Sequence, residues 1–491
     1  MPYLGRTLRT SGGLARAADD LARDALPALD RVAAGLTYDA LRPSGDRVAL
    51  DPLVAAREPL ARVVSSLTAT EARVRALPAS FVLGPVRSAR SSLLGELASL
   101  RGSAAVAELG ARLGPPMLGA EGPRRYFVAI LTNAELRGSG GLLGAYAILE
   151  ADRGRLRLRE LGTNSLLRNV AVPAVDLGPE FAARYDRFAA RSYWVNANMS
   201  PHFPAASAVW TALWARTHGG ERLDGTIAVD PVGLAAILRV TGPARLASGE
   251  VVTADNVVDL TEREAYARYA ADNRARDAYL QDVARAAYQR VVSTRASASL
   301  LSALASAAGS RHLQVASEHP DEAAALAAAP IAGVLPETDR PYVEVTTQNA
   351  AGNKLDYYLR RSVTYERVDA ETSRITVRLR NDAPPGLPAY VSNRLDLPGL
   401  KAPVPGQHRV YLSVFTTTGG GLLGATLDGA ALAMESETER GHPVLSAFLP
   451  VDPGRERVLV LTVRDPGRGA PLVRPAPGVA ADDVTVRGFG T

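Results

Sequence analysis

The sequence predicts a multidomain protein with a helical N-terminal region, an α/β domain built on a mixed sheet, and a C-terminal β-sandwich. Apolar residues recur at helical spacing up to about residue 114. Strand and helix patterns then alternate up to about residue 340, and strand patterns alone follow. A chain of 491 residues is also too long for one ordinary domain. The expected domains are therefore 1–114, 115–340 and 341–491.

The N-terminal region is rich in leucine at three-, four- and seven-residue spacings, as between Leu14 and Leu21. Alanine and arginine, which favour helices, fill the intervening positions. Pro and Gly breaks near Arg42–Gly45, Pro78 and Gly102 predict three or four antiparallel helices. Packing alone explains such a pattern, so a helical stalk or bundle is expected.

The middle region alternates between short β-rich runs and longer helical patterns, which favours helices over a mixed sheet. Strands are expected at 126–132, 145–151, 155–161 and 226–229, and helices at 204–218, 231–239, 255–266, 272–293 and 321–328. The C-terminal region has β-rich runs separated by Pro, Gly, Asp and Asn, which predict a broadly immunoglobulin-like sandwich. Its strands are expected at 342–347, 357–368, 374–380, 408–416 and 457–463.

Composition narrows the possible functions. Apolar residues make up 47% of the chain and charged residues 22%, as in ordinary globular proteins. The net charge of +5 is small for this length and does not indicate nucleic acid. Nearly all basic residues are arginine, since Lys354 and Lys401 are the only lysines. The absence of cysteine excludes disulfides, thiolate catalysis and cysteine-ligated metals.

Neither a signal peptide nor a membrane-spanning run is visible. Residues 1–20 lack an apolar core segment, and no run reaches the roughly 18–20 apolar residues that span a bilayer. We expect either a soluble protein or one anchored by a segment that precedes this sequence.

The common catalytic motifs are also missing. The sequence has no HExxH, no GxxxxGK[ST] and no GxSxG, and its six histidines do not cluster at metal-ligand spacing. The Gly138–Gly140 string fails GxGxxG because Leu143 occupies the third glycine position. Metalloprotease, P-loop, dinucleotide-binding and α/β-hydrolase chemistries are therefore disfavoured, and no metal ligand or catalytic residue is assigned.

The first candidate site follows the first expected strand. Asn133, Glu135 and Arg137 alternate along an extended run, so all three can face one cleft. The glycines of Gly138–Gly141 would let the backbone approach a ligand closely. A strand end whose side chains satisfy turn backbone groups explains the same residues.

Further candidates lie in the second half of the α/β region. Asn196 and Asn198, flanked by aromatic residues, carry amides that can bind sugars, phosphates or backbone. Asp230 ends a strand and precedes a helix, where it binds a ligand or serves as the N-cap. Arg274 and Arg276 open a helix against its dipole, which a nearby anion would explain. Their pairing with neighbouring aspartates explains it equally well.

Several long strings resemble a bacterial family catalogued as domain of unknown function 4012. They are RRYFVAILTNAELRGSGGLLGAYAIL, NANMSPHFPAASAVWTALW, LDGTIAVDPVGLAAILRVTGPARL, QNAAGNKLDYYLRRSVTYE and RNDAPPGLPAYVSNR. The resemblance implies a protein of the bacterial envelope, usually with a membrane helix ahead of the helical region.

The α/β part is in turn similar to LytR-CpsA-Psr proteins, which move glycopolymers from a polyprenyl-pyrophosphate carrier to peptidoglycan. In that comparison, Asp272, Arg274 and Arg276 resemble the arginine-rich helix start that holds pyrophosphate. Arg137 and Asn164 fall near the strand ends where those enzymes carry further Arg and Asp.

Two departures bear on catalysis. Gly138–Gly141 replaces the Arg-Ser-Asp-Thr string that supplies a magnesium-linked Asp in those enzymes, and Gly162–Ser165 replaces their Pro-Arg-Asp string. Phosphoryl transfer depends on such charge neutralisation. No cofactor is therefore expected, and Mg²⁺ enters only if the protein is a transferase of this type.

Together these observations predict an extracytoplasmic protein of the cell envelope that binds or assembles glycopolymer or protein partners through an arginine-lined cleft. The alternative is a LytR-CpsA-Psr-type transferase that acts on a polyprenyl-pyrophosphate carrier. We expect no nucleic-acid partner, and contact with the membrane through a helix outside this sequence. The candidate ligand-binding residues are Asn133, Glu135, Arg137, Asn164, Asn196, Asn198, Asp230, Asp272, Arg274 and Arg276.

Overall fold

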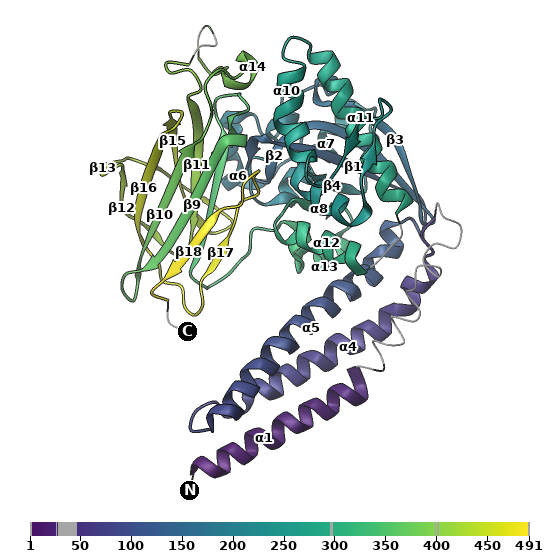
Figure 1. The fold of residues 1–491 in the computed structure, drawn as a ribbon, viewed down its shortest axis with the longest axis vertical. Helices are drawn as coiled ribbons and strands as arrows, with labels where there is room; N and C mark the ends of the chain where they lie inside the picture. The colour runs from purple at the N-terminus through teal and green to yellow at the C-terminus, as the bar shows by residue number, and fades with distance from the viewer. Residues whose placement is uncertain are drawn as a thin grey trace. The chain divides into compact units, whose positions relative to one another are not determined.

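A computed structural model of the chain describes residues 2–25, 27, 47–294, 298–397, 399 and 402–489 (Figure 1). The contacts divide it into two compact units. Unit 1 comprises the chain up to Arg124 together with Glu150–Arg157. Unit 2 comprises Arg125–Leu149, Leu158–Thr294 and the chain from Ala298 onward. The expected boundaries at about residues 114 and 340 stay predictions.

Unit 1 is helical, as the leucine spacing predicts. Its helices are α1 (Pro2–Asp20), the π-helix η1 (Leu21–Ala25), α4 (Asp51–Ala76) and α5 (Gly84–Met117). They share a core that includes Ala17, Val63, Leu67, Val74 and Leu97. No helix in the described part of the chain is both long and apolar enough to span a bilayer.

The expected helix breaks have different outcomes. Pro78 lies in the connection between α4 and α5, where a break was expected. The break expected at Gly102 is wrong, because α5 continues through this residue. A glycine weakens a helix by only about 1 kcal/mol, which long-range packing against α4 offsets. Arg42–Gly45 lies outside the described residues.

Unit 2 begins with a five-stranded mixed sheet. Its strands are β1 (Arg124–Arg137), β2 (Gly140–Asp152), β3 (Arg155–Thr163), β4 (Gly225–Val229) and β7 (Leu313–Ser317), in the order β3-β2-β1-β4-β7. β4 runs parallel to β1 and antiparallel to β7. The mixed sheet was expected, whereas β7 was not predicted. A separate two-stranded ribbon consists of β5 (Ala244–Arg245) and β6 (Val251–Val252).

The helices of this part of the chain are α6 (Gly178–Tyr185), α7 (Phe203–Thr217), α8 (Pro231–Thr241), α9 (Val257–Asp259), the π-helix η5 (Leu260–Glu264), α10 (Ala265–Arg268), α11 (Asn273–Ser293), α12 (Ala298–Gly309) and α13 (Pro320–Ala327). α7 packs on one face of the sheet, and α8 and α11 lie over the other. Short 3-10 turns are η2 (Asn164–Leu166), η3 (Asp186–Phe188), η4 (Trp194–Asn196) and η6 (Pro330–Ala332).

The aromatic core lies on one face of the sheet. Phe127 of β1 is fully buried and contacts Trp210 and Trp214 of α7, with ring centroids 5.8 and 6.2 Å away. Because side chains alternate along a strand, Val128 and Ile130 point to the opposite face. That second face carries the cavity described below.

The C-terminal region is rich in strands, as expected. One sheet has the order β14-β15-β11-β8-β17 and the other β13-β12-β16-β10-β9-β18. The strands are β8 (Tyr342–Asn349), β9 (Leu359–Arg367), β10 (Thr372–Asn381), β11 (His408–Thr416), β12 (Gly421–Leu427), β13 (Ala430–Ala431), β14 (Glu435–Glu439), β15 (His442–Val451), β16 (Glu456–Arg464), β17 (Leu472–Arg474) and β18 (Asp483–Arg487). The helical turns η7 (Leu355–Tyr358) and α14 (Ala389–Ser392) lie between strands.

The two C-terminal sheets share one apolar core. Val345 and Val414 of the first sheet pack in the same buried cluster as Val363, Ile375 and Leu461 of the second. Five of these strands were predicted. Most of the others are short, rich in glycine or strongly charged, and so lack the alternation that marks a strand. The exception is β15, a ten-residue apolar strand with two prolines that was also not predicted.

Candidate functional site

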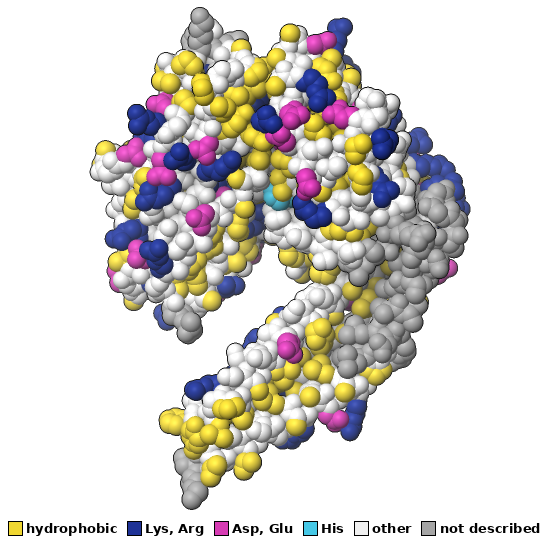
Figure 2. Space-filling model, in the orientation of Figure 1, with side chains coloured by type: hydrophobic (Ala, Val, Ile, Leu, Met, Phe, Trp, Pro, Cys, Tyr) yellow, Lys and Arg dark blue, Asp and Glu magenta, His cyan; other side chains and the backbone are white. Residues whose placement is uncertain are grey.

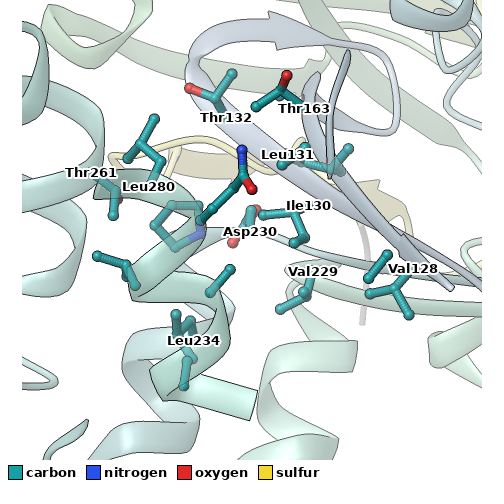
Figure 3. Close-up of a pocket in the computed structure, with 18 of the residues that line it drawn as sticks. Val128, Ile130, Leu131, Thr132, Thr163, Val229, Asp230, Leu234, Thr261 and Leu280 are labelled. Atoms are coloured by element: carbon teal, nitrogen blue, oxygen red, sulfur yellow. The ribbon is translucent and has the colours of Figure 1, made fainter. Parts of the chain in front are cut away.

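A cavity of about 360 Å³ lies on the second face of the unit 2 sheet. Most of its wall is apolar and comes from β1, β2 and β4 together with α8 and α11. Figure 3 shows Val128, Ile130 and Val229 from the strands, with Leu234 of α8 and Leu280 of α11. The wall residues of α11 recur every three to four positions, as expected for one face of a helix.

Polar groups gather on one side of this cavity. In Figure 3, Thr132 and Thr163 lie away from Val128 and Leu234, and Asp230 lies between the two groups beside Ile130. The other polar or aromatic lining residues are Asn164, Thr261, Glu262, Tyr266, Arg276, Asp277, Gln281, Tyr288, Lys354 and Tyr390. Those connected by the contacts described below are Thr132, Asp230, Glu262, Tyr266, Arg276, Lys354 and Tyr390. The cavity therefore combines an apolar body with a charged and aromatic side, which we call the polar end.

Glu262 is the buried acid of the polar end. Its carboxylate accepts hydrogen bonds from the backbone N–H groups of Asn133 (3.1 Å) and Ala134 (2.7 Å) and from the Thr132 hydroxyl (2.7 Å). Burial raises the pKa of Glu262, these hydrogen bonds oppose the rise, and the nearby Asp230 adds to it; the resulting pKa is about 7. The residue belongs to a π-helix, a feature that often marks functional sites.

Asp230 ties β1 to the start of α8. Its Oδ1 accepts from the Gly233 N–H at 2.9 Å, which confirms the expected N-cap role. Its Oδ2 accepts from Asn133 Nδ2 at 3.0 Å and lies 2.6 Å from His312 Nδ1. Asn133 thus reaches the polar end indirectly, through an aspartate that lines the cavity.

Two cations and two tyrosines form a second cluster of the polar end. The Arg276 guanidinium lies over the rings of Tyr266 and Tyr390, 5.2 and 4.4 Å from their centroids. The Lys354 ammonium lies 5.8 and 5.7 Å from the same two rings. Arg276 also donates to Asn273 Oδ1 at 2.9 Å, so the start of α11 holds its orientation. Lys354 and Tyr390 come from the C-terminal region, which therefore completes the cavity.

Glu135 and Arg137 belong to a buried polar layer behind the cavity. Glu135 forms an ion pair with Lys354, and both side chains are buried. Burial alone would lower the pKa of Lys354, but Glu135, Tyr266 and Tyr390 together outweigh burial and raise that pKa. Arg137 donates to the carbonyls of Leu136 and Asn349 and does not line the cavity. The cleft expected from their alternation is filled by protein.

Asn196 and Asn198 bind backbone. Asn196 donates to the Phe188 carbonyl and Asn198 to the Gly141 carbonyl, each at 2.8 Å. Asn164 also donates to a carbonyl, that of Leu143 at 2.8 Å, but it lines the cavity as well.

The three residues expected to bind one ligand at the start of α11 lie in different environments. Asp272 is the N-cap of the helix and accepts from the Ala275 N–H at 3.0 Å. Arg274 is exposed, and only Arg276 lines the cavity. Arg276 also contacts Asp277 at 3.4 Å, so pairing with a neighbouring aspartate accounts for part of its environment.

The glycines of Gly138–Gly141 accommodate other parts of the chain rather than the cavity. A Cβ at Gly138 would lie 2.0 Å from the Met199 carbonyl oxygen, and one at Gly141 would lie 2.0 Å from that of Thr132. Ser139 is fully buried, and its hydroxyl donates to the Ser200 carbonyl. The glycines therefore do allow a close approach of the backbone, but they approach other backbone segments of the protein and not a ligand.

Sequence reasoning did not select Thr132, Glu262, Tyr266, Lys354 or Tyr390. A usable signal existed for Lys354, which is one of only two lysines in an arginine-rich chain. Glu262 and Tyr266 are one helical turn apart, but they meet Thr132 and Tyr390 only through tertiary contacts, which no spacing in the sequence marks.

The polar end does not fit the Mg²⁺ that the transferase alternative requires. Among the described residues no group of three or more His, Asp or Glu side chains is arranged to hold a metal. Asp230 and Glu262 already accept several hydrogen bonds each, which occupy the lone pairs a hard cation would need.

Comparison with known proteins supports the family part of the resemblance. No curated protein matches the chain. Residues 121–266 match the family described as "Protein of unknown function (DUF4012)". This segment contains β1 to β4 and η5, and with them most of the sheet wall of the cavity. It does not include α11, Lys354 or Tyr390.

Proposed function

We propose that this protein works in the bacterial cell envelope, outside the cytoplasm, and binds a lipid-linked glycopolymer precursor or a similar amphiphile in its cavity. One observation carries the proposal: an apolar cavity inside unit 2 ends at a pair of cations framed by tyrosines. The proposed partners are a glycopolymer, its polyprenyl-pyrophosphate carrier or envelope proteins. We also propose that the α/β domain is similar to LytR-CpsA-Psr proteins and that the C-terminal sheets form an immunoglobulin-like sandwich.

The cavity walls favour an apolar chain. Val128, Ile130, Leu234 and Leu280 offer no hydrogen bonds, so a sugar or nucleotide would lose its hydration there without compensation. A hydrocarbon chain gains about 25 cal/mol for each Å² that it removes from water. The cavity volume lies in the usual range for small-molecule sites, roughly 300–1,000 Å³.

The polar end favours an anionic head group. Arg276 presents a planar fork suited to phosphate and is oriented by Asn273 and the two tyrosine rings. Lys354 adds a second positive charge, which forms an ion pair with Glu135. A phosphate or pyrophosphate next to an apolar chain would therefore meet complementary groups at both ends.

Glu262 favours a second candidate function, transfer of the glycopolymer from its carrier. A pKa of about 7 lets a carboxyl group accept a proton near neutral pH. In this candidate a hydroxyl acceptor that enters the polar end loses its proton to Glu262 as its oxygen bonds to a phosphorus atom held by Arg276. The pyrophosphate P–O bond to the carrier breaks in the same step, and polyprenyl phosphate leaves. This candidate requires turnover, whereas the binding function requires only occupancy.

Ligand-induced heat stabilisation tests the binding function. We expect a polyprenyl phosphate or pyrophosphate to raise the unfolding temperature of the full chain, because a ligand that binds only the folded state stabilises it. Ala284→Trp, which fills the cavity, should abolish the effect. Ala278→Trp, an exposed position on the same helix, should leave it intact. Equal stabilisation of both variants, or none of the parent protein, would refute the proposal.

A further inference from the structure

We propose that unit 1 ends in a surface that docks on an anionic lipid bilayer. The surface, here called the apolar tip, consists of the start of α1 and the connection between α4 and α5. Five of its large hydrophobic side chains are exposed, from 44% for Tyr3 to 72% for Leu8. They are Tyr3, Leu4, Leu8, Phe81 and Leu83. Figure 2 shows hydrophobic side chains gathered at the end of the helical unit that carries the N-terminus.

Contacts within unit 1 hold the two segments together as one surface. The Thr10 hydroxyl donates to the Pro78 carbonyl at 3.1 Å, and the Leu83 N–H donates to the Thr7 hydroxyl at 3.3 Å. Thr7 and Thr10 are buried, whereas Leu4 and Leu8 are exposed. This part of α1 therefore turns threonines inward and leucines outward, the reverse of an ordinary surface helix.

Phe81 provides a second, independent observation. Its backbone has φ of 57°, in the left-handed region that bulky residues avoid, and its side chain is 68% exposed. Glycine would adopt this conformation without strain and without exposing a ring to water. Strained residues of this kind often lie at functional positions. The Arg6 guanidinium lies 5.5 Å from the Phe81 ring centroid, so an aromatic ring and a cation are presented together.

The charge around the tip identifies the partner. Residues 2–10 and 77–87, which make up the tip, contain three arginines and no aspartate or glutamate. These arginines are Arg6, Arg9 and Arg87, and all three are exposed. A second copy of the chain would bring like charges together at a symmetric interface. An anionic bilayer complements both properties, since it accepts exposed aromatic and leucine side chains and attracts arginine.

Vesicle flotation of the full chain tests this inference. We expect the protein to float with vesicles that contain phosphatidylglycerol and much less with phosphatidylcholine alone, and raising the salt concentration should weaken binding. A variant with Phe81→Gly and Leu8→Ser should bind about ten-fold more weakly, because it withdraws one ring and one leucine from the membrane. Phe81→Gly also relieves backbone strain, so its unfolding temperature should not fall.

Two controls separate the tip from other effects. Leu423→Ser removes a side chain of similar exposure (61%) on β12 in unit 2 and should leave flotation unchanged. Ala284→Trp fills the cavity and should also float like the parent, so a failed cavity proposal would not affect this one. The inference is overturned if the parent protein ignores anionic vesicles or if the double variant binds them equally. A tip-dependent dimer that forms without vesicle binding would overturn it as well.

Discussion

Lys354 forms a buried ion pair with Glu135, a residue 219 positions earlier in the chain. The pair joins the C-terminal region to the end of β1 and places the lysine ammonium beside Tyr266 and Tyr390 at the polar end of the cavity. The strand-rich region is thus part of the site.

Breaking this pair should destabilise unit 2. Lys354→Met leaves the Glu135 carboxylate buried without its main partner, and removing one member of a buried pair costs about 3–5 kcal/mol. Arg137, 3.5 Å from Glu135, offsets part of this loss, so we expect about 3 kcal/mol. Urea unfolding of the parent and of Lys354→Met measures this difference in the free energy of unfolding. The double variant Glu135→Gln with Lys354→Met should recover part of the loss, and an equal loss in both would contradict this role for the pair.

Glu262 should make folding stability depend on pH. Its pKa is about 7 in the folded protein and near its ordinary value when unfolded. A raised carboxyl pKa stabilises the fold at low pH, and this contribution disappears as pH rises through the folded value. Between about pH 5 and about pH 8 the parent should lose about 2.5 kcal/mol through this group, a loss that is absent from Glu262→Gln. Identical pH profiles in urea unfolding would show that Glu262 does not titrate in this range.

Arg276 should distinguish charged from neutral ligands. Arg276→Gln removes a guanidinium that meets an anionic head group, and a charge-assisted hydrogen bond contributes about 1.5–3 kcal/mol, or roughly 10- to 100-fold in affinity. Arg274→Gln, on the exposed side of the same helix turn, is the matched control and should bind normally. Titration with a polyprenyl phosphate and with the uncharged polyprenol makes the comparison. Equal weakening for both ligands would mean that Arg276 acts on the fold and not on the head group.

The glycines at two positions should respond oppositely to alanine. Gly138→Ala places a Cβ 2.0 Å from the Met199 carbonyl oxygen, so backbone must shift and stability should fall by more than about 2 kcal/mol. Gly102→Ala meets nothing within 4 Å inside α5 and should stabilise by about 0.5–1 kcal/mol. Thermal unfolding of the parent and the two variants measures both stability changes. Stabilisation by Gly138→Ala would contradict the contact described for the β1–β2 turn.

Sequence patterns predict the parts of this fold that local periodicity determines. The long helices and the first four strands of the mixed sheet follow from the spacing of apolar residues. β7 and β14 were not anticipated, because Leu313–Ser317 is short and Glu435–Glu439 is mostly charged. These strands form through pairing with distant partners, which a local pattern does not encode.

The site was less predictable than the fold for a related reason. Asp230 is a candidate because it precedes a helix, and Arg276 because arginine at a helix start opposes the dipole unless an anion is near; both line the cavity. Arg137 is a candidate because it alternates with Asn133 and Glu135, but it donates to the carbonyls of Leu136 and Asn349. Whether a charged residue meets protein or an open cavity depends on contacts across more than 200 positions. No spacing in the sequence reports those contacts.

Mass spectrometry of the organic extract from the purified full chain, expressed in a bacterial host, is the most direct test of the cavity. The account predicts an anionic lipid with a long apolar chain in the parent protein and in Ala278→Trp, and its loss from Ala284→Trp. A lipid retained equally by Ala284→Trp, or a parent protein that carries none and takes up no added polyprenyl phosphate, would contradict it.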